Sequence, residues 1–318
     1  MIPPEPGAAL AGSAAPDRGH LLTEQANPAS ASLDQLSSSE LVDLFCREDE
    51  KALLAMEAAA PALAEAVEAI SARLRSGGRL FYLGAGTSGR LGVLDAAECP
   101  PTFCTPPELV QGVLAGGAPA LLRSSEGLED LREAGRDDLI ERGFTPADAL
   151  VGIAAGGTTP YVLGGLEHAR SLGALAIAMA CVPQEQAPMP CTIDIRLVTG
   201  AELLTGSTRL KAGTATKMAL NIISTGVMVR LGKVYGNRMV DVAVTNSKLE
   251  DRALRILRDL AGVERERGSE LLAAAGGSVK RALVMAAAGL SAEQADAALS
   301  AHDGQVRQAL EQLGAQLA

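Results

Sequence analysis

The most informative segment of the chain reads Phe81-Tyr82-Leu83-Gly84-Ala85-Gly86-Thr87-Ser88-Gly89-Arg90. An apolar run, a glycine-rich turn and the start of helical periodicity follow one another here, which is typical of the first unit of a βαβ sheet. Further apolar runs that close in small residues recur along the chain. With the first, the five runs are Arg79–Gly86, Leu109–Gly116, Ala149–Gly156, Ala174–Cys181 and Ile193–Gly200. Their nearly continuous hydrophobicity predicts an α/β fold with a doubly wound, parallel five-stranded sheet that is covered by helices on both faces.

Helical periodicity occupies the stretches before, between and after these runs. Ser37 and Glu40 form a capping-box pattern ahead of a predicted helix at 40–75. The other helices predicted around the sheet are 128–142, 161–172 and 207–231.

The chain changes character after Asn246. No strand signal remains, and short Ala/Leu-rich helices run to the C-terminus, one of them beginning at the capping box Ser291-x-x-Gln294. We therefore expect a disordered-like extension at 1–20, an α/β domain at 21–250 and a small helical bundle at 251–318.

Composition excludes several classes of partner. The chain of 318 residues has 28 Lys+Arg against 38 Asp+Glu, a net charge of −10, with four Phe, three Tyr and no Trp. Nucleic acids and anionic membranes call for basic stripes, and single strands also call for stacking aromatics, so neither partner is expected. A single phosphate group is still compatible with this charge, because helix N-termini and hydroxyls bind it without Lys or Arg.

The cysteines and the N-terminus indicate the compartment. Five cysteines form no CxxC pair, the first 20 residues lack the basic and apolar regions of a signal peptide, and no apolar run approaches the ~20 residues of a membrane span. We expect free thiols and a cytoplasmic protein.

The turn Gly84–Gly89 matches the dinucleotide pattern GxGxxG. That pattern also needs a carboxylate about 20 positions on, at the end of the second strand, and the chain has only Ala115-Gly116-Gly117 there. Hydroxyls at Thr87 and Ser88, next to free backbone N–H groups, instead favour a terminal monophosphate. The alternative is a glycine turn whose hydroxyls only cap the helix.

Two further turns carry hydroxyls. The third strand runs into Gly156-Gly157-Thr158-Thr159-Pro160, where Thr158 or Thr159 could cap a helix that starts at Pro160. The turn Thr205–Thr208 precedes the long helix, whose cations either face phosphate or are solvated. These cations are Arg209, Lys211 and Lys217. The predicted phosphate-binding residues are Gly86, Thr87, Ser88, Gly156, Thr158, Thr159 and Ser207.

Carboxylates are the candidates for acid–base chemistry. No Ser/His/Asp arrangement and no metal-binding cluster is evident, so we expect no metal and no cofactor. Glu98 has small and apolar neighbours, and desolvation there would favour its protonated form. Glu129 follows the second strand and could face the same edge. The alternative for both residues is a solvated helix face.

Several long blocks resemble the N-acetylmuramic acid 6-phosphate etherases, which have the SIS (sugar isomerase) fold, an αβα sandwich. The resemblance covers about residues 22–318. The blocks are Thr23-Glu24-x-x-Asn27, Leu83–Gly92, Leu94–Thr102, Glu126-Gly127-x-Glu129-Asp130, Thr205–Ala215 and Gly232–Asn237. The resemblance implies Glu98 as proton donor and Glu129 as the second catalytic residue. It also implies a homodimer with shared sites and a C-terminal bundle of the ubiquitin-associated type.

The activity implied by the resemblance is hydrolytic cleavage of the D-lactyl ether of N-acetylmuramic acid 6-phosphate, by elimination and then addition of water. Related etherases commonly read Ala-Ser-Gly-Arg-Thr-Pro where this chain reads Ala155–Pro160, so a serine is missing at 156 and an arginine at 158. The animal glucokinase regulatory protein is similar in fold and binds sugar phosphates without catalysis. A non-catalytic sugar-phosphate sensor is therefore the main alternative, and a sugar-phosphate isomerase is the third.

Overall fold

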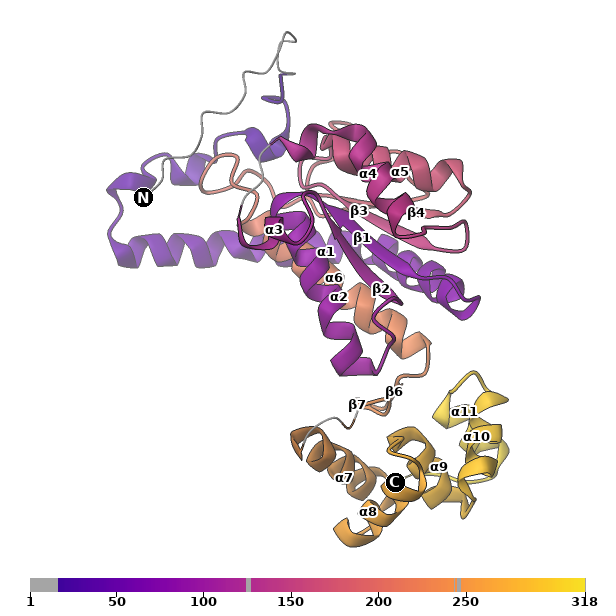
Figure 1. The fold of residues 1–318 in the computed structure, drawn as a ribbon. Coiled ribbons are helices and arrows are strands. Elements are labelled where there is room, and N and C mark those ends of the chain that lie inside the picture. The colour runs from indigo at the N-terminus through magenta and orange to yellow at the C-terminus, as the bar shows by residue number, and fades with distance from the viewer. Residues whose placement is uncertain (1–16, 124–126, 243, 245–246, 318) are drawn as a thin grey trace.

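A computed structural model describes residues 17–123, 127–242, 244 and 247–317 (Figure 1). Its centre is a five-stranded sheet in which every neighbouring pair is parallel, in the order β2-β1-β3-β4-β5. The strands are β1 (Leu80–Gly84), β2 (Val110–Leu114), β3 (Ala149–Ile153), β4 (Leu175–Ala180) and β5 (Ile193–Arg196). Each lies within one of the five apolar runs, so the predicted α/β fold is confirmed.

Helices cover both faces of this sheet. One face carries α1 (Ser38–Arg75), α2 (Gly86–Phe103) and α6 (Lys211–Arg230), and the other carries α4 (Arg132–Glu141) and α5 (Pro160–Ser171). The N-terminal half of α1 extends beyond the sheet (Figure 1). The short elements around the sheet are the 3₁₀ turns η1 (Leu22–Glu24), η2 (Pro28–Ser30), η3 (Leu33–Gln35) and η4 (Leu128–Asp130), and helix α3 (Pro119–Leu122).

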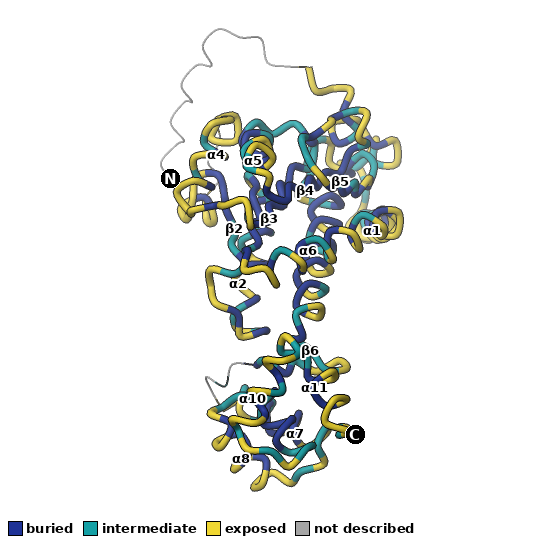
Figure 2. Tube along the Cα trace, turned by 90° about the vertical axis from the view of Figure 1, so that its right-hand side faces the viewer, coloured by how far each residue is buried: buried dark blue, intermediate teal, exposed yellow. Residues whose placement is uncertain are grey.

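The alternation of side chains along each strand divides the core in two. Tyr82 and Val151 pack with α1, α2 and α6, whereas Phe81 and Leu150 pack with α4 and α5. All four are at most 1% exposed, and the strands are mostly dark blue, the colour of buried residues, in Figure 2. This double coverage explains why the runs read as continuously apolar.

Two predicted helices begin later than expected. The helix expected at 128–142 is divided into η4 and α4, because Leu131 adopts an extended backbone conformation between them. The helix expected from Ser207 begins only at Lys211. Gly206 has a φ of +75°, which keeps residues 204–210 in a loop.

The strand order reverses between β1 and β3, which run side by side with Gly84 opposite Ile153. Chains leaving these two strands therefore diverge to opposite sides of the sheet and leave a crevice at their carboxyl ends. Open α/β sheets bind their ligands at such a crevice.

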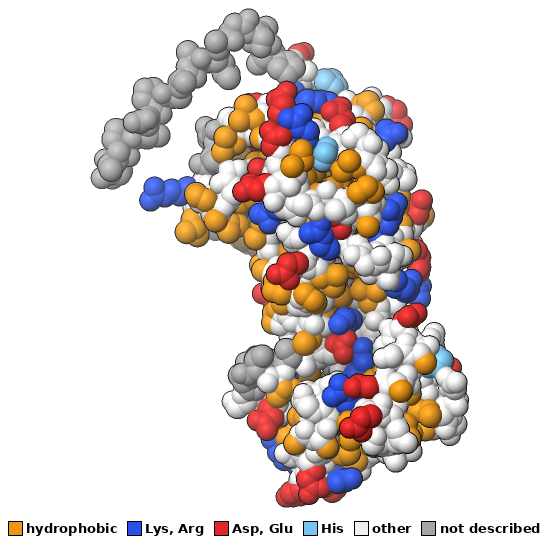
Figure 3. Space-filling model, turned by 45° about the vertical axis from the view of Figure 1, so that its right-hand side comes forward, with side chains coloured by type: hydrophobic (Ala, Val, Ile, Leu, Met, Phe, Trp, Pro, Cys, Tyr) orange, Lys and Arg blue, Asp and Glu red, His pale blue; other side chains and the backbone are white. Residues whose placement is uncertain are grey.

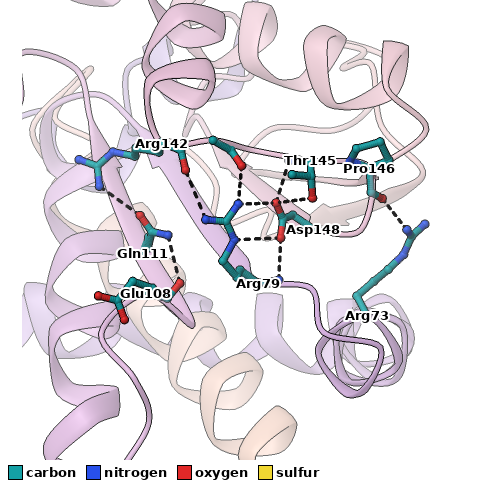
Figure 4. Close-up of polar contacts among 9 residues, drawn as sticks. Arg73, Arg79, Glu108, Gln111, Arg142, Thr145, Pro146 and Asp148 are labelled. Atoms are coloured by element: carbon teal, nitrogen blue, oxygen red, sulfur yellow. Dashed lines mark hydrogen bonds and ion pairs between the residues drawn. The ribbon is translucent and has the colours of Figure 1, made fainter.

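The opposite, amino edge is held by one carboxylate (Figure 4). Asp148, which is 1% exposed, precedes β3 and accepts hydrogen bonds from the backbone N–H and the guanidinium of Arg79, just before β1. It also accepts from the backbone N–H and the hydroxyl of Thr145. Burial alone would raise the pKa of Asp148, but these bonds lower it overall.

The C-terminal part is a separate helical layer below the sheet (Figure 1). It follows the small hairpin of β6 (Val234–Tyr235) and β7 (Arg238–Met239) and has its own core, which includes Val240 and Leu283. Its helices are α7 (Ser247–Ala261), α8 (Arg265–Ala274), α9 (Val279–Ala288), α10 (Ala292–Ser300) and α11 (Val306–Gln312).

Both predicted capping boxes, at the starts of α1 and α10, are present. Of the predicted extension at 1–20, residues 1–16 lie outside the described residues. Across the described ranges no single helix is long and apolar enough to cross a membrane. Helices α8 and α9 would meet that length and composition only as a pair bent by 111°.

Candidate active site

The first hydroxyl-bearing turn lies directly on the β1 side of the crevice. Gly86 begins α2 with a φ of +53°. Gly84 and Gly89 bring strand and helix into close contact, since a Cβ added at Gly89 would lie 2.4 Å from the backbone oxygen of Gly84. Ala85 is the N-cap of α2 and has no side chain that could cap it. Thr87 and Ser88 therefore do not serve as the helix cap, and both remain partly exposed at the N-terminus of α2.

The second turn lies opposite, on the β3 side. Pro160 occupies the first turn of α5, as predicted, and Thr159 is the N-cap by position. The predicted cap position is therefore confirmed at Thr159, but its side chain makes no capping bond. Gly156, Thr158 and Thr159 are partly exposed.

The hydroxyls of the three turns share one property. Within the described part of the chain none of them has a hydrogen-bond partner, and they are those of Thr87, Ser88, Thr158, Thr159 and Ser207. Two of the turns also present free N–H groups of helices longer than eight residues. Free hydroxyls and helix N-terminal N–H groups are donors of the kind that bind the oxygens of a phosphate group.

The third turn differs, because a carboxylate already occupies the N-terminus of α6. Glu202 is fully buried and accepts hydrogen bonds from the backbone N–H groups of Lys211 and Ala212 at 3.2 and 2.9 Å. Burial raises the pKa of Glu202, and these two bonds offset part of the rise. Ser207 lies in the loop that precedes this capped end, so its hydroxyl could reach a ligand without help from the α6 dipole.

The sequence left open whether the cations near the long helix face phosphate or are solvated. Two of the three instead pair with carboxylates of this chain. Lys211 is 1% exposed, and its Nζ donates to Glu48 Oε2 at 2.6 Å and to the Ala201 carbonyl at 2.7 Å. Asn27 donates to the same two acceptors. Lys217 pairs with Asp95 at 2.7 Å. Arg209 alone is exposed.

Glu98 and Glu129 are both exposed in the single chain, so the burial expected around Glu98 is absent from it. Glu98 lies on α2 eleven positions after Thr87, which places the two side chains only about 20° apart around the helix axis. Leu94 lies on the same face and is 48% exposed. Glu129 lies in η4, and Glu126 of the same block lies outside the described residues.

Sequence reasoning missed a buried polar contact on α2. Asp95, one turn earlier on α2, is 4% exposed and accepts hydrogen bonds from the Tyr82 hydroxyl at 3.2 Å and from Lys217. This contact connects α2 to β1 and to α6. Its only sequence signal is a charged residue among small ones, which does not by itself indicate a partner.

Comparison with known proteins identifies relatives that match nearly the whole chain. A protein from Synechococcus sp. strain CC9902 named N-acetylmuramic acid 6-phosphate etherase is 74% identical over 95% of this chain and 96% of its own. One of the same name from Synechocystis sp. is 64% identical over 93% of this chain and 97% of its own. The chain belongs to the N-acetylmuramic acid 6-phosphate etherase family.

Two domain families also match this member of the etherase family. They are described as the glucokinase regulatory protein N-terminal SIS domain, at residues 62–170, and the C-terminal lid domain of glucokinase regulatory protein, at residues 236–281. A phosphoheptose isomerase from Francisella tularensis has a similar structure over 60% of this chain and 98% of its own, with 18% identity and a TM-score of 0.43. Those two values are too low to bear on activity.

Proposed function

We propose that this chain converts N-acetylmuramic acid 6-phosphate and water into N-acetylglucosamine 6-phosphate and D-lactate. One observation carries the proposal. Two turns with unpartnered hydroxyls lie side by side at the crevice of a chain that belongs to the etherase family. The second strand lacks the carboxylate that a dinucleotide would need, so a sugar phosphate is the better fit.

The phosphate group supplies positioning. Gly86, Thr87 and Ser88 donate from the first turn, and Gly156, Thr158 and Thr159 from the second, with Ser207 at the rim. Binding energy gained at this remote group orients the sugar carbons toward the carboxylates.

The reaction itself needs one acid and one base. In the open-chain sugar the C2 proton is acidic, because C2 lies next to the C1 aldehyde. Glu129 as carboxylate removes that proton, the electron pair forms the C2–C3 double bond, and the C3–O bond breaks. Glu98 as carboxylic acid protonates the departing lactate oxygen. Water then adds at C3 and a proton returns to C2, and each assisted transfer contributes about 10²–10⁴-fold in rate.

A second copy of the chain would complete this site. Glu98 lies twelve positions after Gly86 on α2, about 18 Å along the axis. Six bonds of about 1.5 Å separate phosphorus from C2, a span of at most about 9 Å. A homodimer in which a partner covers the Thr87–Glu98 face would bring the groups together and desolvate Glu98.

Exposed apolar side chains favour such a partner. Leu94 lies between Thr87 and Glu98, and Leu122 beyond β2 is 93% exposed. Hydrophobic side chains also form patches on the surface of the molecule in Figure 3. Leu94→Asp should therefore give a monomer with little lactate release, measured by mass photometry and by lactate assay, whereas an active monomer would contradict the shared site.

Lactate release is the decisive assay. The wild type incubated with N-acetylmuramic acid 6-phosphate should release D-lactate, and Glu98→Gln should lower kcat by about 10²–10⁴-fold. Glu108→Gln, an exposed carboxylate just before β2, is the matched control and should act as wild type. Thermal protection by the substrate without lactate would favour the sensor, and interconversion of aldose and ketose without lactate would favour the isomerase.

The setting and the domain limits are part of the same proposal. Amino-sugar recycling from peptidoglycan in the cytoplasm would supply this substrate, and five free cysteines suit that compartment. The proposed domain limits are 21–250 and 251–318. The separate C-terminal core supports a second unit, and Val240 and Val242 of the preceding segment also belong to that core. The match to a lid domain favours a bundle that covers the site.

A further inference from the structure

The loop 201–210 is closed at its base by the residue that follows it. Lys211 donates from its Nζ to the Ala201 carbonyl at 2.7 Å and from its backbone N–H to Glu202 Oε2 at 3.2 Å. The first two residues of the loop are thus joined to the first residue of α6. The loop lies between β5 and α6, at the carboxyl edge of the sheet, and it carries Ser207.

Lys211 belongs to a buried ring of four groups, which also includes Asn27, Glu48 and the Ala201 carbonyl. The Nζ of Lys211 donates to Glu48 Oε2 at 2.6 Å. The Nδ2 of Asn27 donates to the same Glu48 oxygen at 2.8 Å and to the same Ala201 carbonyl at 3.0 Å. Two donors therefore share two acceptors, and the three side chains are at most 6% exposed. Asn27 is part of the block Thr23-Glu24-x-x-Asn27, to which the proposed reaction gives no role.

Stability alone does not explain the buried pair of Lys211 and Glu48. Apolar side chains of similar volume often replace such a pair without loss of stability, because desolvation of the charges offsets their attraction. The loop that the ring holds contributes little to the core. Leu203 is buried, but none of residues 204–210 is. The position of the loop therefore depends on the bonds at its base.

The loop lies next to the first hydroxyl-bearing turn. Gly213, in the first turn of α6, is buried between the two. A Cβ built on it would lie in van der Waals contact with Thr87 Cγ2 at 3.6 Å and with the Thr208 carbonyl oxygen at 3.5 Å. Thr87 and the backbone beside Ser207 are therefore neighbours across Gly213. A displaced loop would change the distance between Ser207 and a phosphate group bound at Thr87.

We propose that Lys211 and Asn27 are positioning residues for substrate binding. Through the ring they hold the loop 201–210 so that the Ser207 hydroxyl donates to the phosphate group bound at the first turn. Neither residue touches the substrate. The inference rests on the proposed function for the identity of that substrate, and it gives Asn27 and its sequence block a role.

Asn27→Leu is the first test. It removes two of the four bonds of the ring and leaves the pair of Lys211 and Glu48 in place. KM for N-acetylmuramic acid 6-phosphate should rise about tenfold, as expected when one hydrogen bond to a charged group is lost, while kcat stays within about twofold. An unchanged KM would overturn the proposal.

A pair of variants separates positioning from stability. Lys211→Met alone leaves Glu48 buried without its main partner, so it should lower the melting temperature and raise KM. Adding Glu48→Met should restore the melting temperature but leave KM about tenfold above the wild type, because methionine donates nothing to the Ala201 carbonyl. Recovery of both quantities in the double variant would mean that the ring acts only on stability, and would overturn the inference.

Two controls accompany these variants. Asp148→Asn, at the amino edge, removes a buried hydrogen-bonded carboxylate far from the loop and should lower the melting temperature without raising KM. Asn27→Leu also removes the bond from the Ala29 backbone N–H to Asn27 Oδ1. The Lys211 and Glu48 double variant keeps that bond, so a raised KM in both cases assigns the effect to the ring.

Ser207→Ala shows whether the ring acts through this hydroxyl. Asn27→Leu should raise KM less than about twofold in the Ser207→Ala background, against about tenfold in the wild type. Equal increases in both backgrounds would overturn the inference.

Inorganic phosphate separates this inference from the proposed function. It should raise the melting temperature of the wild type, and Asn27→Leu should weaken that protection, whereas Asp148→Asn should not. A wild type that releases no lactate, yet shows this Asn27-dependent protection, would refute the proposed function and leave the inference standing. Lactate release with equal protection in Asn27→Leu and the wild type would refute only the inference.

Discussion

At the amino edge of the sheet, Asp148 accepts five hydrogen bonds from Arg79 and Thr145, whereas at the carboxyl edge Thr87 and Thr158 have no partner in the described chain. Both edges belong to the same five-stranded sheet. The difference is that the polar side chains beside Arg79 and Asp148 bond to one another, whereas the hydroxyls of the turns after β1 and β3 have no partner in the described chain. A fold with a ligand site at one edge of a sheet can therefore be strengthened or weakened at the other edge without touching the site.

The largest expected effect is on kcat/KM and comes from removing phosphate donors at the carboxyl edge. The double variant Thr87→Val, Ser88→Ala removes two phosphate donors, and kcat/KM for N-acetylmuramic acid 6-phosphate should fall about a thousandfold, because each bond to a charged group contributes about 1.5–3 kcal/mol. The melting temperature should stay unchanged, since neither hydroxyl has an internal partner. Ser76→Ala, at the end of α1 near the amino edge, is the control and should leave kcat/KM unaffected. A large fall in melting temperature of the double variant would mean that these hydroxyls support the fold.

The next largest effect is on the free energy of unfolding and comes from a substitution at the amino edge. Asp148→Asn removes a buried carboxylate that accepts five hydrogen bonds and should lower the free energy of unfolding by about 3 kcal/mol, measured by urea denaturation. KM of the folded protein should not change. Asp137→Asn changes an exposed carboxylate that pairs with its neighbour Arg136, and it should lower stability by less than about 0.5 kcal/mol. A raised KM in Asp148→Asn would show that the two edges are coupled.

Sequence reasoning reached the two turns because their signals are local. A glycine at a strand end, a hydroxyl and a helix start occupy consecutive positions, so Gly84–Ser88 and Gly156–Pro160 could be assigned to the crevice before the structure was known. The strands were predictable for the same reason, since coverage on both faces leaves an unbroken apolar run.

The missed features depend on partners that are distant in the sequence. Glu48 and Lys211 are 163 positions apart, and Asp95 and Lys217 are 122 apart, so no local pattern shows that these charges neutralise one another. The cap of α6 by Glu202 arises from a loop that folds back. Glu98 and Glu129 are exposed in the single chain, and the proposed site would join them only through a second copy of the chain.

Acid titration should distinguish carboxylates that have partners from those that do not. Burial raises the pKa of Glu48, but hydrogen bonds from Lys211, Lys51 and Asn27 outweigh this and lower it from 4.5 to about 2. The stability that Glu48 contributes is therefore fully present above pH 4.5 and is lost as the pH falls toward 2. Asp148, whose pKa is also lowered, loses its contribution below about pH 3.8.

Urea midpoints measured at pH 6, 4 and 3 test this dependence. The wild type should lose stability over this range, and Glu48→Gln should lose less of it, starting from a lower value at pH 6 because Lys211 is left buried without its partner. Glu57→Gln, an exposed carboxylate on the same helix, should follow the wild type. Identical slopes for the wild type and Glu48→Gln would show that the Lys211 pair does not control acid stability.

The smallest expected effect tests whether every polar contact at the amino edge matters. Arg73 donates to the Pro146 carbonyl at 2.7 Å from the solvent side of the edge, where water can replace it (Figure 4). Arg73→Ala should therefore lower the free energy of unfolding by only about 0.5 kcal/mol, with kcat and KM unchanged. Comparing the loss of unfolding free energy in Arg73→Ala and in Asp148→Asn measures how much more the buried carboxylate contributes than the exposed contact. A loss as large as that of Asp148→Asn would mean that the outer contact is as important as the buried one, and that the edge is held by its whole network.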